Sequence, residues 1–231
     1  MRYRSNLPQP EINGFKLLSP PRLMFGHDAP SDPDYDSACT FWTHDEAAIL
    51  YAIANAGRRG DRWVDIGSRF GWTAAHLIVG GADVVLVDPI YQYEAQLDRL
   101  HDNLRSFPNG LLTLSRDFDH AAGDLQANGV RFYGAVIDGN HDEPYPQTDA
   151  ERAMKLGCQV IVFHDFWGKP IRDGVRFLEG LGWKVRVYNT PNGVACCWRD
   201  PKFLPPDHVP DPGIEWNRES WAPDFDWSVC I

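Results

Sequence analysis

Five short apolar runs recur through the middle of the chain, and each is followed by a segment with helical periodicity. The runs lie at residues 63–66, 84–88, 111–114, 133–138 and 160–164. Apolar runs of this length without strict polar alternation are typical of strands that are buried on both faces. Such strands alternating with helices predict an α/β domain, in which helices cover both faces of a mostly parallel sheet.

The helices predicted between these runs have recognisable beginnings and ends. The first begins at a capping box, in which Thr43 caps the helix and Glu46 reaches back, and it stops near Gly57. A second helix follows Gly71. The periodicity predicts four more at about residues 94–105, 118–127, 148–156 and 171–181.

The last two apolar runs have a different connection. Residues 183–188 and 193–198 are separated by only four residues, Asn189-Thr190-Pro191-Asn192. No helix fits into a connection of this length, so the two runs are predicted to form a hairpin.

The connection after the first strand is the most informative part of the sequence. The strand at 63–66 runs into a turn with Gly67 and Gly71, and glycine permits a tight turn and a close approach of the backbone to a ligand. The second strand ends at Asp88, where a carboxylate can accept hydrogen bonds from ribose hydroxyls. This order predicts a nucleoside-cofactor site. The alternative, a strand-to-helix turn that binds nothing, is disfavoured by the position of Asp88.

The spacing of the glycines also distinguishes between cofactors. A dinucleotide fold has the pattern Gly-x-Gly-x-x-Gly, whereas Gly67 and Gly71 are four residues apart. Asp65, at the start of the turn, would repel a pyrophosphate but suits a cationic ligand such as S-adenosylmethionine (SAM), which has sulfonium and ammonium charges. An NAD-dependent oxidoreductase is the less favoured alternative. A module that binds SAM or S-adenosylhomocysteine (SAH) without transferring a methyl group stays open.

A second group of polar residues follows the fourth and fifth strands. Asp138 and His141 come after one strand, and His164 and Asp165 after the next. Ligands bind outside the carboxyl ends of parallel strands, so we expect these side chains in the same crevice as the cofactor. The two aspartates could hold a divalent cation such as Mg²⁺, and His141 could remove a proton from an acceptor hydroxyl. Alternatively, the aspartates cap turns and His141 only hydrogen-bonds Asp138.

These residues resemble the motifs of class I SAM-dependent methyltransferases, in particular the metal-dependent O-methyltransferase branch with the catechol-type and macrolide sugar enzymes. The similarity covers about residues 43–200 and rests on Asp-x-Gly-x-x-x-Gly at 65–71, Gly71-Trp72-Thr73, Ile137-Asp138-Gly139 and His164-Asp165. It implies a Rossmann-like α/β fold: a seven-stranded, mostly parallel sheet with an antiparallel last strand and helices on both faces.

The resemblance also assigns roles to residues. Thr73 would hold the methionine carboxylate of SAM, Asp88 the ribose, and Asp117 would lie near the adenine. Asp138 would bind a divalent metal and His141 would act as the general base. The further cofactor-binding residues would be Asp65, Gly67, Ser68 and Gly71, and the further metal ligands His164 and Asp165. Because a histidine here stands where the branch usually has an acid, two alternatives stay open: a softer ion such as Mn²⁺, or no metal at all.

Composition narrows the function further. The 231 residues include 32 acidic and 22 basic side chains, and the net charge of -10 disfavours nucleic acid as a partner. No apolar run reaches the ~18 residues of a membrane span and no signal peptide is recognised, so we expect no membrane partner. Five cysteines without a Cys-x-x-Cys pair predict buried thiols in the cytoplasm.

Pro-rich segments without a hydrophobic period flank the alternating region. We therefore divide the chain into an N-terminal arm at 1–42, a SAM-dependent methyltransferase domain at 43–200, and a C-terminal tail or lid at 201–231. His208, in the tail, has no partner at ligand spacing and is expected at the surface. The sequence thus predicts a methyltransferase that acts on a hydroxyl of a small molecule, such as a sugar, polyketide or phenol. A homo-oligomer is left open.

Overall fold

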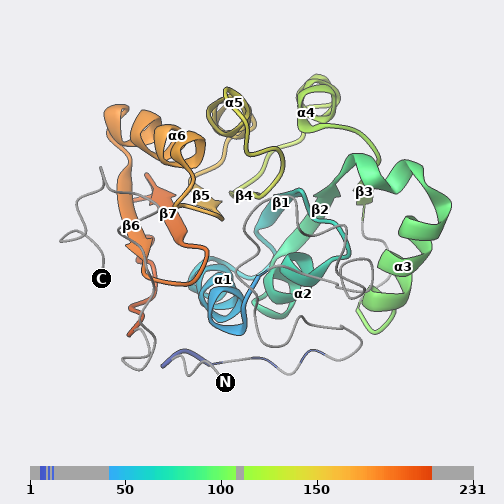
Figure 1. Cartoon of the computed structure of the whole chain (residues 1–231), viewed down its shortest axis with the longest axis horizontal. Helices are drawn as coiled ribbons and strands as arrows, with labels where there is room; N and C mark the ends of the chain where they lie inside the picture. Colours follow the sequence, from blue (N-terminus) through green and yellow to red (C-terminus); the bar gives the residue numbers. More distant parts are fainter. Residues whose placement is uncertain (1–5, 9, 11, 13–41, 108–111, 210–231) are drawn as a thin grey trace.

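The structure of this protein is a computed structural model, and it describes residues 6–8, 10, 12, 42–107 and 112–209. Seven strands in these ranges form one sheet (Figure 1). They are β1 (Arg62–Ile66), β2 (Asp83–Val87), β3 (Leu112–Leu114), β4 (Gly134–Ile137), β5 (Val160–Phe163), β6 (Lys184–Tyr188) and β7 (Val194–Trp198). Their order across the sheet is β3-β2-β1-β4-β5-β7-β6.

The direction of the strands confirms the predicted sheet. β1 to β5 pair in parallel, whereas β7 pairs antiparallel with both β5 and β6. The predicted hairpin of β6 and β7 is present, because the connection between them is too short for a crossover. β4 and β5 are buried along their whole length, as expected for strands with helices on both sides.

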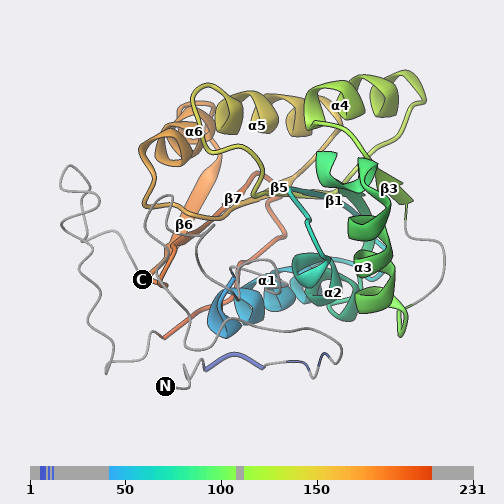
Figure 2. The ribbon, with the colours of Figure 1, turned by 45° about the vertical axis from the view of Figure 1, so that its right-hand side comes forward.

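Helices cover both faces of the sheet (Figures 1 and 2). One layer contains α4 (Phe118–Ala127), α5 (Tyr145–Lys155) and α6 (Lys169–Gly180), and the other contains α1 (His44–Ala56), α2 (Trp72–Val79) and α3 (Glu94–Leu104). Each layer buries its own apolar cluster against the strands. The predicted fold class, α/β with a Rossmann-like sheet, is therefore confirmed.

Two helices begin earlier than the periodicity predicts, and proline explains both differences. α5 begins at Tyr145 and α6 at Lys169, and each has a proline in its first two positions. Proline fits the start of a helix because its φ is already helical and the first N–H groups have no partner inside the helix. The capping box is present as predicted: Glu46 accepts a hydrogen bond from the backbone N–H of Thr43 at 2.8 Å, and Thr43 caps α1.

The flanking segments lie largely outside the described residues. The predicted arm is described only at residues 6–8, 10, 12 and 42, and the predicted tail only up to 209. The prediction that His208 lies at the surface is wrong, because its side chain is 3% exposed and packs edge-on against Tyr188. Cys158, Cys196 and Cys197 are buried free thiols. Among the helices described, none is both long and apolar enough to cross a bilayer.

Candidate active site

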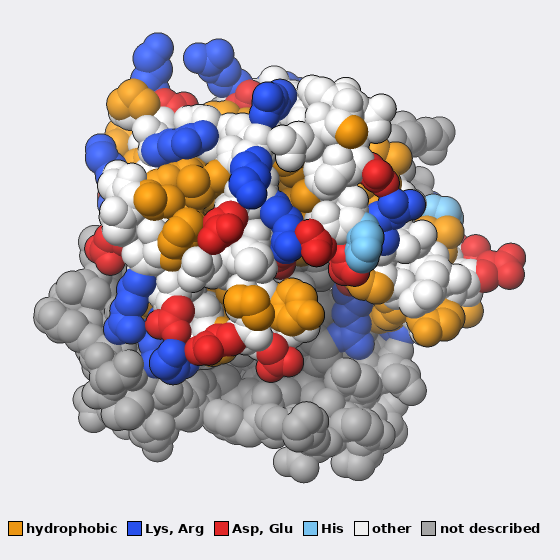
Figure 3. All heavy atoms as spheres, turned by 90° about the horizontal axis from the view of Figure 1, so that it is seen from above, with side chains coloured by type: hydrophobic (Ala, Val, Ile, Leu, Met, Phe, Trp, Pro, Cys, Tyr) orange, Lys and Arg blue, Asp and Glu red, His pale blue; other side chains and the backbone are white. Residues whose placement is uncertain are grey.

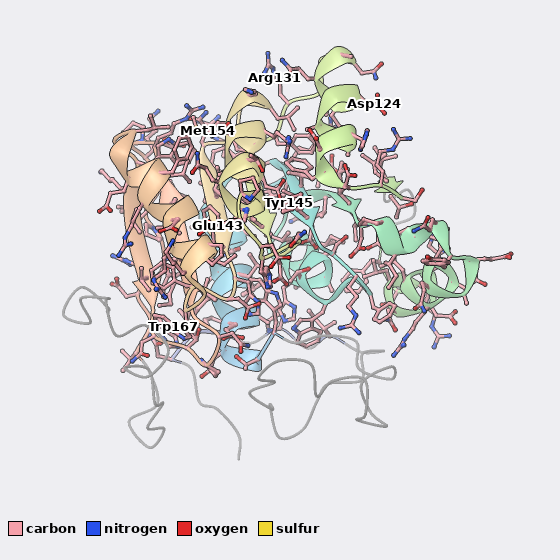
Figure 4. The ribbon with its side chains drawn as sticks, turned by 45° about the horizontal axis from the view of Figure 1, so that its top comes forward. Asp124, Arg131, Glu143, Tyr145, Met154 and Trp167 are labelled. Carbon is pink, nitrogen blue, oxygen red and sulfur yellow. The ribbon has the colours of Figure 1, made fainter. Side chains whose placement is uncertain are left out.

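A cavity of about 1120 Å³ opens at the carboxyl ends of the parallel strands. It lies where the chain order reverses between β1 and β4, the usual ligand site of an open α/β sheet. Its lining includes Tyr145, at the start of α5 (Figure 4). Nine predicted site residues also line it: Gly67, Ser68, Thr73, Asp88, Asp117, Asp138, His141, His164 and Asp165.

The turn after β1 has the backbone that its glycines allow. Gly67 and Gly71 have φ values of 79° and 86°, in the left-handed region, and Arg69 between them has a φ of 43°. A Cβ atom at Gly67 would lie 2.0 Å from the carbonyl oxygen of Asp138. Glycine is therefore required at this position by close approach as well as by conformation. Gly71 does not line the cavity but caps the N-terminus of α2.

Asp88 has a fixed carboxylate at the cavity wall. Its two oxygens accept hydrogen bonds from the backbone N–H groups of Arg69 and Ile90, each at 2.9 Å. Burial raises its pKa, although these two bonds oppose the shift. The glycine turn and the end of β2 are thus tied together, and the hydroxyls of Ser68 and Tyr91 add a second tie at 2.7 Å.

Asp65 lies behind the cavity wall rather than in it. The side chain is fully buried, and its Oδ2 accepts a hydrogen bond from the Thr73 hydroxyl at 2.5 Å. The other oxygen, Oδ1, is buried without a hydrogen-bond partner among the described residues. Burial raises the pKa of Asp65 to about 7, against the opposing effect of the Thr73 bond. An incompletely satisfied buried carboxylate of this kind fits a cationic ligand nearby.

Thr73 connects Asp65 to the cavity. Its hydroxyl has one proton, which it donates to Asp65, while the residue itself lines the cavity. The hydroxyl can donate to a ligand carboxylate instead when Asp65 is protonated and becomes the donor of their shared bond.

Asp117 also lines the cavity, at the beginning of α4. It caps this helix by accepting the backbone N–H of His120 at 2.9 Å. The hydrogen bonds and the charge of His120 lower the pKa of Asp117 in spite of slight burial.

Asp138, His141 and Asp165 converge at the ends of β4 and β5. The Nε2 atom of His141 lies 3.4 Å from Asp138, and its Nδ1 atom lies 3.5 Å from Asp165. Ligand atoms of all three residues lie within 4.8 Å of one another, which suits a divalent cation. Asp165 has a φ of 53°, and such strained backbone is concentrated at functional sites.

His164 is buried between acids on both sides of its ring. Nδ1 lies 3.1 Å from Asp138 and 3.3 Å from Asp165, and Nε2 lies 3.3 Å from Glu46. Burial lowers the pKa of His164, but the charges of Asp165 and Asp138 outweigh it and raise the pKa well above its ordinary value. The role of His164 as a metal ligand stays a prediction, and it would require Nδ1 because Nε2 faces Glu46.

Three further residues belong to the site, although none of them is among the site residues predicted above. Trp42 stacks flat on the ring of His164, with the ring centroids 4.2 Å apart, and donates its Nε1–H to Asp138 at 2.7 Å. Glu46 contacts both His164 and Asn192, and Asn192 belongs to the β6–β7 connection. Trp42 precedes α1 and Glu46 lies in its first turn, so the only local sequence signal near them was the capping box.

The solved structures that resemble this chain include SAM-dependent methyltransferases. The O-methyltransferase TomG from Streptomyces achromogenes, in complex with SAM, has a TM-score of 0.55 and 15% identity, over 68% of this chain and 80% of that one. The SAH-bound methyltransferase PaMTH1 from Podospora anserina has a TM-score of 0.53 and 15% identity, over 74% and 85%.

A precorrin-6y C5,15-methyltransferase from Geobacter metallireducens gives a TM-score of 0.54 at 14% identity, over 68% of this chain and 89% of that one. No protein-family model matches the sequence, and no curated protein matches it. The chain therefore has the fold of the class I SAM-dependent methyltransferases, a fold shared by enzymes with different acceptors.

Proposed function

We propose that the protein is an O-methyltransferase that moves the methyl group of SAM to a hydroxyl of a small molecule. The observation that carries the proposal is the convergence of Asp138, His141 and Asp165 in the same cavity as the glycine turn. A proton acceptor beside a nucleoside-cofactor site is what methylation of a hydroxyl requires. The net charge of -10 favours a small acceptor, such as a sugar, polyketide or phenol, over a nucleic acid.

SAM would be held by the first two strand ends and would supply an electrophilic methyl group. Asp88 would accept hydrogen bonds from the ribose hydroxyls, and Thr73 would donate to the methionine carboxylate. Asp65 would then be protonated and donate to Thr73, and its unpartnered Oδ1 would stay available as an acceptor for an N–H group of the cofactor. Asp117 would lie toward the adenine. The bound cofactor would then be oriented by backbone and side chains that the fold has already fixed.

His141 would take the proton of the acceptor hydroxyl. Its side chain is 42% exposed, so an acceptor can reach it, and the carboxylates of Asp138 and Asp165 would stabilise the imidazolium that forms. Asp138 and Asp165 also fit a divalent cation, with Nδ1 of His164 as a third donor. Such an ion, when bound, would lower the pKa of the acceptor hydroxyl.

The proposal is tested first by calorimetry of SAM binding, with EDTA and then with Mn²⁺ or Mg²⁺, and by SAH formation with a panel of sugars and phenols. We expect SAM to bind in the micromolar range and Asp138→Asn and His141→Gln to lose about 100-fold in kcat. Asp142→Asn is the control, because this acid is exposed in the same loop and does not line the cavity.

Each negative result has a separate meaning. If calorimetry shows no binding of SAM and NAD instead raises the melting temperature, an oxidoreductase is favoured. SAM binding without SAH formation from any acceptor would favour a non-catalytic binding module. Equal binding and turnover with and without EDTA would remove the metal from the proposal and leave the proton transfer by His141 intact.

A further inference from the structure

Glu46 has a carboxylate that is fully buried and heavily hydrogen-bonded. Its side chain is 0% exposed. Oε2 accepts from the backbone N–H of Thr43 at 2.8 Å and from the side chain of Asn192 at 3.2 Å, and Oε1 accepts from the backbone N–H of Asn192 at 2.8 Å. The Nε2 atom of His164 lies 3.3 Å from Oε2. A glutamate is almost never buried to this extent unless it has such partners.

The capping function explains only one of these contacts. A capping box requires the bond from Thr43 to the glutamate, which can be made by a glutamate at the surface. The contacts with His164 and Asn192 span 118 and 146 residues of sequence and serve no purpose for the helix end. They join the start of α1, the end of β5 and the β6–β7 connection around one side of the cavity.

The contact with His164 determines how that ring presents its other nitrogen. Because Nε2 faces an acceptor, it carries a proton, and the ring plane is fixed with Nδ1 directed at Asp138 and Asp165. Trp42 covers the face of the same ring and donates to Asp138. The orientation of Asp138 therefore depends on a ring that Glu46 and Trp42 hold in place.

We propose that Glu46 is a positioning residue of the active site, which acts through His164 on Asp138 and Asp165. The ring of His164, once anchored at Nε2, keeps these two carboxylates close together at the point where His141 receives the acceptor proton. The effect on turnover rests on the proposed function, whereas the effect on the His164 ring does not.

The test compares two variants that both weaken the capping box. Glu46→Gln replaces a charged acceptor of the His164 proton with an amide, while Thr43→Ala removes the hydroxyl that accepts from the backbone N–H of Glu46 and leaves its carboxylate in place. We expect Glu46→Gln to lower kcat by 10- to 100-fold with the SAM Kd within about threefold of the wild type. Thr43→Ala is expected to lower the melting temperature with kcat within twofold.

A second measurement needs no variant and no activity. In the ¹⁵N-labelled wild type, the imidazole correlation spectrum should show a proton on Nε2 of His164 with the downfield shift of a hydrogen bond to a carboxylate, assigned by loss of the signal in His164→Asn. An Nε2 without a proton, or with a proton that lacks this downfield shift, would overturn the proposal even if the variants fail to fold. So would a Glu46→Gln protein with unchanged kcat and ring signals. If the wild type neither binds SAM nor forms SAH, the proposed function fails, while the ring signal still decides the role of Glu46.

Discussion

The two fully buried acids of the site, Asp65 and Glu46, have opposite electrostatic surroundings. Burial raises the pKa of both, but Glu46 faces His164 and several N–H donors, which together lower its pKa below the ordinary value. Asp65 has fewer donors, the Thr73 hydroxyl and the backbone N–H of Ala74, and the charges of Asp138 and Asp88 add to the effect of burial, so its pKa is raised to about 7. The fold thus keeps Glu46 ionised, whereas the ionised form of Asp65 would be stabilised by a positively charged group beside it.

The raised pKa of Asp65 predicts a pH-dependent gain of stability in Asp65→Asn. The native state keeps the Asp65 proton between about pH 4, the unfolded value, and about pH 7, so stability falls as pH rises through this window. Asparagine lacks this titration and can still pair with Thr73. The variant's advantage in free energy of unfolding should therefore grow by about 3 kcal/mol from pH 4.5 to pH 8. Urea denaturation at the two pH values measures it, and a constant difference would contradict the raised pKa.

Substitution of Thr73 tests the cofactor end of the cavity. Thr73→Val keeps the shape but removes the hydroxyl, and a hydrogen bond to a charged carboxylate contributes roughly 1.5–3 kcal/mol. We expect the SAM Kd of Thr73→Val to rise by ~10-fold or more, whereas Thr73→Ser, which retains the hydroxyl, stays within about threefold. Calorimetry gives both values. Equal affinities in the two variants would show that the hydroxyl does not bind the cofactor.

The sequence was a good guide to residues at strand ends and a poor one elsewhere. Asp88, Asp138 and Asp165 could be brought together in advance because parallel strands end at one edge of the sheet. Glu46 could not be linked to His164, because their contact depends on where α1 begins relative to β5, 118 residues away. The burial of His208 could not be predicted for a related reason, since the sequence around it has no hydrophobic periodicity that would show where the segment packs.

At the scale of elements, strand register determines the shape of the cofactor turn. β1 and β4 are neighbours, and Ile66 pairs with Ile137 at their ends. The next residues, Gly67 and Asp138, are consequently side by side, and the turn must pass the Asp138 carbonyl without a side chain. The pairing of β1 with β4 thus fixes both the cofactor turn and the Asp138 carboxylate beside it. The hydrophobic pattern of the sequence was enough to predict both strands.

Gly67→Ala should therefore destabilise the protein much more than the same substitution at another glycine with a left-handed backbone. Gly129 has a φ of 68° but open space around its Cβ position, so Gly129→Ala bears only the conformational cost, roughly 1–2 kcal/mol. At Gly67 the methyl group would also overlap backbone 2.0 Å away. We expect a loss of about 4 kcal/mol or more in chemical denaturation, together with loss of SAM binding. Similar losses in the two variants would refute the close approach.

At the scale of the whole molecule, two features lie outside the sheet: a charged helical face and a terminal segment at the β6 edge. On the face formed by α4, α5 and α6, Lys and Arg side chains are mixed with Asp and Glu (Figure 3). At the β6 edge of the sheet, residues 203–209 pack against the strand: Phe203 is 2% exposed and Tyr188 donates to the carbonyl of Pro206 at 2.9 Å. Asn6 donates to the carbonyl of Asp207 and accepts from the N–H of Val209, so segments from both ends of the chain meet there.

Arg186 is the main polar anchor of this segment, and its loss should free residues 203–209 without unfolding the sheet. Its Nη1 lies 2.8 Å and 2.9 Å from the carbonyls of Pro205 and Pro206 and 2.7 Å from the carboxylate of Asp207. Arg186→Met keeps the apolar stem but removes these donors, and hydrogen bonds from a charged group contribute roughly 1.5–3 kcal/mol.

Hydrogen exchange distinguishes local release from global loss of stability. In Arg186→Met, the amides of Phe203 and Val209 should exchange about tenfold faster or more, while amides of β4 and β5 keep their rates. Arg199→Met is the matched control, because the Arg199 side chain packs over Trp183 and donates its hydrogen bond to Gln159, not to residues 203–209. Acceleration of the strand amides as well would mean that the segment is part of the cooperative core. Since an edge strand exposes unpaired backbone groups, a segment that opens locally would make β6 the place where a second chain could pair.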